Sequence, residues 1–347
     1  MQITSSERNS RDGSIDVYRG ICMLLVILGH SIGYITDPVN RYIISFHMPI
    51  FLFISGMCVS LSVKQRSISE NIVHKLKSIG FQYLAFSLIG LLIYWLLLSR
   101  IGRDNGISVG ESLLGILTSR SVVNGFWFVY DLLVISVLYI FMQRDKMRPF
   151  TFFLASFAGF VVFEPLQSYG LPKEIIRILG GAIFFSLGDM FGLFVLPALK
   201  MLICKERIRF VLYGLVLLII VGLVALTNSP VLMYSANFGN KWMFIFGAIL
   251  ASFAFSIISK IIGRSKYLEY IGRNSICFLF FQFYALDATH MLFNVIWGNG
   301  LNNTFPYYMV HFISATGLCY VFAFFYNSYL PFLKSYENLH NVWRRKI

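Results

Sequence analysis

The chain has 347 residues, of which 57% are hydrophobic and only 13% are charged. Soluble domains carry about 25% charged residues on average, so a soluble globular domain is excluded. The net charge of +13 would suit a nucleic-acid-binding protein. Here the basic residues lie in short connections between apolar runs, and no nucleic-acid partner is expected.

Apolar runs of about 20 residues, the length that crosses a bilayer as a helix, recur along the whole sequence. The sequence therefore predicts an all-α polytopic membrane protein of about ten transmembrane helices. The expected ranges are 17–36, 42–62, 78–98, 125–143, 150–164, 174–198, 210–227, 241–262, 275–297 and 305–333. Pro49 lies inside the second range and is expected to kink that helix. A further short helix is expected around 109–119.

Lysine and arginine are unevenly shared between the two sides of the membrane. When the N-terminus is assigned to the cytoplasm, 22 of them fall on the cytoplasmic side and 7 on the opposite side. Short cytoplasmic loops are enriched in these residues, so both termini are expected in the cytoplasm. The chain is predicted to form one multi-pass domain over 1–347, with a cytoplasmic N-terminal segment 1–16 and a tail 335–347.

The first apolar run carries Arg19 near its start and His30 near its end. Eleven residues make about three helical turns, so the two side chains project from nearly the same face, about 16 Å apart along the axis. Asp16 shares that face. Ionisable groups inside a bilayer are costly and tend to be functional. The stripe therefore places an anion-binding guanidinium at the cytoplasmic rim and an imidazole deep in the membrane, a span comparable to the pantetheine arm of coenzyme A.

Four more titratable residues are expected near the depth of His30: His47, Asp131, Asp287 and His290. His47 faces His30 across the turn between the first two helices. A carboxylate that orients a histidine base is a familiar catalytic arrangement, and Asp131 and Asp287 are both candidates for that role. We assign Asp131 to the predicted catalytic group with the two histidines. Asp287 and His290 are assigned to the substrate site.

Two further groups of residues allow two interpretations each. Trp127 and Tyr130, at the start of an expected helix, form either an interfacial aromatic belt or a platform for a sugar ring. Lys75 and Lys77 lie in a basic amphipathic stretch that contacts either lipid headgroups or the phosphates of coenzyme A. The five cysteines show no metal-like spacing, and no metal is expected.

Four segments together resemble the acyltransferase 3 family, and most closely its branch of fucose-4-O-acetylase-like proteins. They are "IDVYRGICMLLVILGHSIGY", "ISFHMPIFLFISGM", "GFWFVYDLL" and "YIGRNSICFLFFQFYAL". The resemblance implies a ten-helix protein of the bacterial inner membrane that takes acetyl groups from cytoplasmic acetyl-CoA. It also implies that Arg19 serves the acyl-CoA end and that His30 serves acyl transfer. Where the family often has a basic Arg-x-x-Arg pattern, this chain has Lys75 and Lys77.

Together these observations predict a membrane O-acetyltransferase. Its expected donor is acetyl-CoA, and its expected acceptor is a hydroxyl of a cell-surface glycan: an O-antigen, a capsule, an exopolysaccharide or a lipid-linked precursor. His30 would act as general base or as acyl carrier. The alternative is a transporter or flippase in which the intramembrane Asp and His residues relay protons. Membrane lipids surround the protein in both cases.

Overall fold

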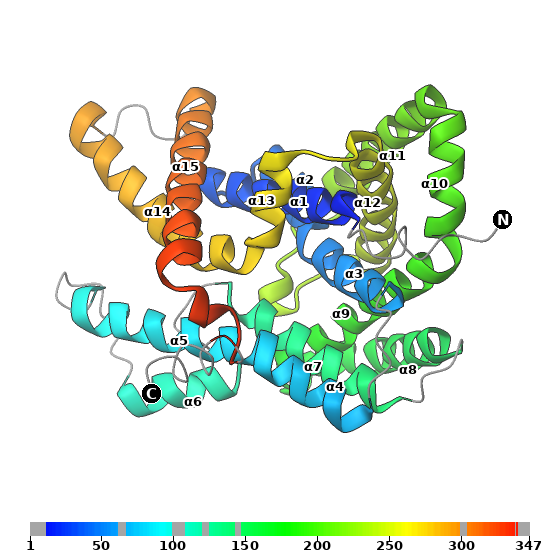
Figure 1. The fold of residues 1–347 in the computed structure, drawn as a ribbon, viewed down its shortest axis with the longest axis horizontal. Helices are drawn as coiled ribbons and strands as arrows, with labels where there is room; N and C mark the ends of the chain where they lie inside the picture. The colour runs from blue at the N-terminus through cyan, green and yellow to red at the C-terminus, as the bar shows by residue number, and fades with distance from the viewer. Residues whose placement is uncertain are drawn as a thin grey trace.

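The computed structural model describes residues 12–61, 67–98, 108–119, 125–142, 147–298, 304–336 and 338. These residues form helices joined by short connections (Figure 1). The described part of the chain contains no β-strand, and its one isolated β-bridge joins Leu232 to Asn237. The predicted all-α architecture is therefore confirmed.

The helices agree closely with the expected spans. Nine described segments are long and apolar enough to cross a membrane: Gly13–Ile32, Pro38–Ser60, Ile68–Leu96, Arg148–Tyr169, Lys173–Lys205, Arg207–Thr227, Lys241–Ile262, Ser275–Trp297 and Phe305–Tyr329. A tenth apolar helix, Trp127–Phe141, has 15 residues and is therefore about 22 Å long. The short member of the set is thus Trp127–Phe141, because the span expected at 150–164 extends over Arg148–Tyr169.

Several spans are built from more than one helix. The first half of the chain contains α1 (Gly13–Ile32), α2 (Pro38–Ile44), α3 (His47–Ser60), α4 (Ile68–Lys75), η2 (Leu76–Gly80), α5 (Phe81–Ile93), η3 (Tyr94–Leu98), α6 (Val109–Leu117), α7 (Trp127–Phe141) and α8 (Arg148–Phe163). The second half contains η5 (Glu164–Tyr169), α9 (Lys173–Met190), η6 (Phe191–Val195), α10 (Leu196–Lys205), α11 (Arg207–Thr227), η7 (Met233–Ser235), α12 (Lys241–Ile262), α13 (Lys266–Arg273), α14 (Ser275–Trp297), α15 (Phe305–Tyr329) and η9 (Pro331–Lys334). The predicted short helix around 109–119 is α6.

Pro49 acts on the second span through a break rather than a simple kink. The span is divided into α2 and α3 just before His47. Pro49 lies in the first turn of α3, where a helix makes no use of the missing N–H. At this break the His47 ring nitrogen Nδ1 lies 3.0 Å from the carbonyl oxygen of Ile43. The break between α2 and α3 thus leaves the Ile43 carbonyl available to the His47 side chain.

Glycines allow the helices around α1 and α3 to approach closely. A Cβ on Gly20 of α1 would collide with the α13 backbone, and one on Gly272 of α13 would collide with the carbonyl of Asp16. Gly56 and Gly188 make the same kind of contact between α3 and α9. Small residues are the usual means of close helix packing in membranes. In Figure 1, α1 lies near the middle of the molecule, between the α14–α15 pair and the α11–α12 pair.

Candidate active site

One stripe of α1 lines two cavities in succession. Arg19 and Met23 line the first cavity, and Val26 and His30 line the second. These four positions are separated by four, three and four residues, which is the spacing of one helix face. The prediction that Arg19 and His30 project from the same face is therefore confirmed. Their separation along the axis remains about 16 Å from the helical rise.

The first cavity has a volume of about 590 Å³ and is rich in positive charge. Its described lining includes four basic side chains and no acidic one: Arg19, Lys75, Arg273 and Lys334. They come from α1, α4, α13 and η9, so segments from both ends of the chain contribute. We call this space the cationic cavity. Its size is that of a small-molecule site, and its charge suits a ligand with several phosphates.

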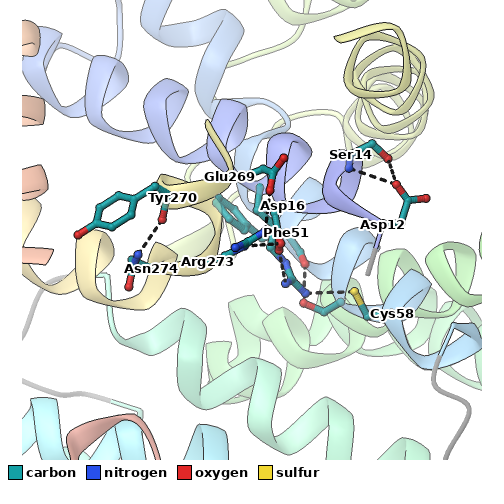
Figure 2. Close-up of polar contacts among 11 residues, drawn as sticks. Asp12, Ser14, Asp16, Phe51, Cys58, Glu269, Tyr270, Arg273 and Asn274 are labelled. Atoms are coloured by element: carbon teal, nitrogen blue, oxygen red, sulfur yellow. Dashed lines mark hydrogen bonds and ion pairs between the residues drawn. The ribbon is translucent and has the colours of Figure 1, made fainter. Parts of the chain in front are cut away.

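Asp16 forms ion pairs with both arginines of the cationic cavity, and Figure 2 shows it beside Arg273. Its carboxylate is buried and accepts a hydrogen bond from Arg273 Nε at 3.0 Å, while Arg19 Nη1 lies 3.8 Å away. Arg19 Nη2 donates to Cys58 Sγ at 3.1 Å, and Arg273 Nη2 donates to Glu269 at 2.5 Å. Asp16 is not among the residues that line the cavity. It therefore fits a positioning role toward an anionic ligand rather than direct contact with it.

Asp12, the residue just before α1, connects the start of that helix to α10 and α12. Its carboxylate caps α1 through the backbone N–H of Ser14 and forms ion pairs with Lys200 at 2.8 Å and Lys260 at 2.5 Å. Burial opposes ionisation of Asp12. The hydrogen bonds from Lys200, Lys260 and Ser14 outweigh that effect and hold the pKa of the carboxyl well below its usual value. The N-terminal end of the stripe is thus firmly held.

The predicted pair Lys75 and Lys77 is divided between two environments. Lys75 lines the cationic cavity, whereas Lys77 lines a separate apolar groove between α4, α5, α6 and α7. Lys77 Nζ lies 5.6 Å from the centroid of the Tyr336 ring. Residues two apart on a helix do not share a face. Only Lys75 of the pair is therefore placed to meet an anion in the cationic cavity.

The second cavity has a volume of about 260 Å³ and is lined by both His30 and His47. We call it the histidine cavity. The His30 side chain is exposed to it, and its ring centroid lies 4.7 Å from that of Phe283. Trp127 and Tyr234 line the same cavity, with ring centroids 6.0 Å apart. The two histidines therefore meet in one space, as the sequence predicts, next to aromatic rings on which a sugar could stack.

The hydrogen bond of His47 defines what its ring can do. A carbonyl oxygen only accepts, so Nδ1 of His47 must carry the proton that it shares with Ile43. In the neutral imidazole the other nitrogen, Nε2, is then an acceptor. His47 is thereby suited to accept a hydrogen bond or a proton. In the neutral form it has no proton to donate toward a developing oxyanion.

Asp131 lies beside the histidine cavity but does not line it. Arg177, which is fully buried, donates to Asp131 through Nε and through Nη2, the latter at 2.9 Å from Oδ1. The same guanidinium donates to the Ser119 hydroxyl at 2.6 Å and lies 4.7 Å from the Trp127 ring centroid. In the described structure Asp131 is thus held by an arginine rather than by a histidine. The ion pair supports the cavity wall that carries Trp127.

Three other residues predicted to bind substrate line neither cavity in the described structure. Tyr130 lines the apolar groove, with its ring centroid 5.7 Å from that of Tyr83. His290 Nδ1 lies 2.5 Å from the Tyr307 hydroxyl, and Asp287 is exposed on α14 one turn before it. Of the predicted aromatic pair, Trp127 alone reaches the histidines.

With this arrangement established, comparison with known proteins identifies the family. A family model described as an acyltransferase domain, that of acyltransferase 3, matches residues 12–324. The chain belongs to the acyltransferase 3 family. This confirms the resemblance drawn from the four motifs, and with it the expectation of an acyltransferase domain in a multi-pass membrane protein. The matched range contains both cavities apart from Tyr326, Asn327 and Lys334, so an acyl donor is implied for this region.

Two curated proteins are also similar to this acyltransferase 3 chain. The nodulation protein NolL of Mesorhizobium japonicum is 30% identical over 139 residues, which cover 38% of this chain and 35% of NolL. The nodulation protein NolL of Sinorhizobium fredii is 28% identical over 144 residues, covering 37% of this chain and 36% of the relative. The aligned segments thus span about a third of each relative. No solved structure is significantly similar.

The sequence analysis did not predict four residues that line or lie beside these cavities: Arg177, Tyr234, Arg273 and Lys334. Arg177 lies five residues after Pro172, near the start of the helix expected at 174–198. A buried Asp131 needs a counter-charge, and that requirement is the signal that points to a partner such as Arg177. Arg273 lies within one of the four family motifs. Tyr234 and Lys334 carry no local signal, since only packing brings them to the cavities.

Among the described residues no group of three His, Cys, Asp or Glu side chains could hold a metal ion.

Proposed function

We propose that the protein transfers an acetyl group from acetyl-CoA to a hydroxyl of a cell-surface glycan or of its lipid-linked precursor. One observation carries this proposal: a single stripe of α1 connects a cationic cavity at Arg19 with a histidine cavity at His30. Family membership supplies the acyl-transfer chemistry. The two cavities provide a place for the anionic donor and a separate place for the neutral acceptor.

The cationic cavity holds the phosphates of the donor. Arginine guanidinium groups bind phosphate through paired, charge-assisted hydrogen bonds, and Arg19 and Arg273 are both oriented by Asp16. Lys75 and Lys334 add two point charges. With the phosphates at Arg19, the pantetheine arm follows the stripe toward His30. The distance of about 16 Å along the helix is within the reach of that arm.

The histidine cavity holds the acceptor and the base. His47 Nε2 accepts a hydrogen bond from the acceptor and orients it, because Nδ1 is engaged by Ile43. His30 then takes the proton of the acceptor hydroxyl, and the hydroxyl oxygen bonds to the thioester carbonyl carbon. The carbon–sulfur bond breaks, and the proton passes from His30 to the departing thiolate. In a variant of this route His30 itself accepts the acetyl group from the thioester and then passes it to the acceptor hydroxyl.

The acceptor is recognised by stacking on aromatic side chains. Trp127 and Tyr234 present two rings to the histidine cavity. The Arg177 guanidinium stabilises the Trp127 ring through a cation–π contact. A glycan fits this lining, since pyranose rings combine apolar faces with hydroxyl groups. We place the protein in the bacterial inner membrane as a single domain with both termini in the cytoplasm, so that the donor arrives from inside and the acceptor from outside.

The test is a strain that lacks this protein, complemented with His30→Ala. The expected result is loss of O-acetyl signals from the surface glycan in NMR spectra. His290→Ala is the matched control, because His290 is a histidine of α14 outside both cavities. Glycan O-acetylation that is unchanged in the His30→Ala strain would rule out the assignment of His30.

A further inference from the structure

The cationic cavity and the histidine cavity share two lining residues. Met48 of α3 and Leu279 of α14 are the described residues that line both. Both are nearly buried, with 5% and 7% of their surface exposed. On the α1 stripe the boundary between the two cavities falls between Met23, which lines the first cavity, and Val26, which lines the second. The boundary between donor and acceptor spaces is therefore made of apolar side chains.

The two cavities lie toward opposite ends of α1 and α3. The cationic cavity takes residues along α3 as far as Cys58 and from the end of α15, whereas the histidine cavity takes His47 at the start of α3 and residues of the α11–α12 connection. On α1 the order is the same, with Arg19 near the start and His30 near the end. Ions and hydrated groups cross an apolar constriction with difficulty. An open path between the cavities would admit water to the donor thioester.

We propose that Met48 and Leu279 form an apolar passage through which the acyl group crosses from the donor cavity to the acceptor cavity, and that its width sets the acyl chain accepted. This inference rests on the proposed function. Methionine suits such a passage because its unbranched side chain changes shape at low cost. The branched side chain of Leu279 has fewer rotatable bonds and adapts less. An acetyl group is a short acyl group, so a tight passage favours it over longer chains.

The chemistry at the passage is that of a thioester and an oxygen nucleophile. In the closed state the acyl carbon meets only the acceptor hydroxyl. If the passage is widened, water from the histidine cavity reaches the thioester carbonyl carbon, the carbon–sulfur bond breaks, and acetate and the free thiol of coenzyme A are formed. Hydrolysis without acceptor is thus the measurable sign of an open passage.

The first experiment uses Cys58 as a native reporter of access, because it lines the cationic cavity. Membrane vesicles of both orientations are treated with a membrane-impermeant, sulfonate-bearing methanethiosulfonate, and Cys58→Ser identifies the signal of this cysteine. We expect labelling from one face of the membrane in the unmodified protein and from both faces in the Met48→Ala/Leu279→Ala double variant. Equal labelling of the unmodified protein from both faces would overturn the passage, as would labelling of the double variant from one face alone.

The second experiment measures acyl selectivity in purified protein. Leu279→Ala is expected to raise acceptor-independent hydrolysis of acetyl-CoA at least tenfold and to improve the use of butyryl-CoA relative to acetyl-CoA. Leu279→Trp is expected to abolish transfer, with a larger loss in turnover than in coenzyme A binding. Leu286→Ala and Leu286→Trp are the matched controls, since Leu286 has the same 7% exposure on α14 and lines neither cavity.

These outcomes separate the passage from the proposed function. If the unmodified protein does not turn over acetyl-CoA, the proposed function fails while the one-sided labelling of Cys58 still reports the barrier. If turnover is normal and Leu279→Trp leaves it unchanged, the passage is refuted and the proposed function stands. Equal effects of substitutions at Leu279 and Leu286 would likewise refute the passage, because they would reflect helix packing alone.

Discussion

The two cavities use the same helix but different physical interactions. Four cations gather at the cationic cavity from segments as distant in sequence as Arg19 and Lys334. The histidine cavity instead presents His30, His47 and aromatic rings beside a fully paired arginine. Cationic side chains bind a polyanion with an affinity that falls as the salt concentration rises. Ring stacking and neutral hydrogen bonds instead select a sugar by its shape. The proposed function therefore assigns donor binding and acceptor chemistry to separate residues, which predicts that the two can be altered independently.

The largest effect is expected from removing His30, the proposed base in the histidine cavity. His30→Gln should lower kcat by about 10²- to 10⁴-fold, the contribution typical of general acid–base catalysis. The dissociation constant for coenzyme A should stay within about threefold, as His30 does not line the cationic cavity. Transfer of labelled acetyl groups and equilibrium binding of coenzyme A measure the two quantities. His290→Gln serves as the control, and a large loss of coenzyme A binding in His30→Gln would contradict the separation of the two cavities.

The next effect concerns the wall of the histidine cavity. Arg177→Met should destabilise the protein by about 3–5 kcal/mol, because it leaves the buried Asp131 carboxylate without its partner. The double variant Arg177→Met/Asp131→Leu should recover much of this loss, since no charge is then left unpaired. Thermal unfolding in detergent followed by tryptophan fluorescence measures both. Arg209→Met, at an exposed ion pair with Glu206, should change stability by less than about 1 kcal/mol.

Failure of the double variant to recover stability would show that the ion pair has another role. In that case acceptor-dependent turnover would separate the two explanations. A purely structural pair predicts that the recovered double variant also regains transfer, because the Trp127 wall is again supported. A direct catalytic role for Asp131 predicts a stable protein without activity.

A smaller effect is expected at the donor end of the stripe. Arg19→Gln should weaken coenzyme A binding by about 10- to 100-fold, which corresponds to the 1.5–3 kcal/mol of a charge-assisted hydrogen bond. At saturating acetyl-CoA, kcat should remain within about threefold of the original value. Arg19→Lys should restore part of the affinity, since the charge returns without the paired geometry. A fall in kcat with unchanged binding would place Arg19 at the chemical step instead.

The smallest predicted difference lies between two neighbouring lysines. Lys75→Gln should raise KM for acetyl-CoA by about three- to tenfold, as expected for loss of one partly exposed charge near an anion. Lys77→Gln should leave KM within about twofold, because Lys77 lies over Tyr336 in the apolar groove. Steady-state kinetics at two salt concentrations test the pair. Equal effects of the two substitutions would show that the cationic cavity extends beyond the described lining.

Much of the fold follows from the sequence because apolar run length is a local property. The ten expected spans correspond to helices, and the Arg19–His30 stripe follows from the helical period alone. The meeting of His30 and His47 also follows, since a short turn joins their helices. In contrast, Asp131 was expected to serve a histidine and instead binds Arg177. Lys77 and Tyr130 were expected at the ligand sites and instead line the apolar groove. Lys77 lies two residues after Lys75 and therefore faces another way, whereas Tyr130 packs against Tyr83 of a separate helix.

The sequence by itself determined the membrane class, the helix pattern, the family motifs and the face of α1 that carries the predicted donor and transfer residues. Only the tertiary structure decided which partners reach that face: Asp16 holds Arg273 from 257 residues away, and Tyr234 joins Trp127 at the histidine cavity. The physical reason is that helical periodicity acts over a few residues. Ion pairs and cavities instead depend on how separate helices pack, and glycines such as Gly20 and Gly272 allow α1 and α13 to come close enough.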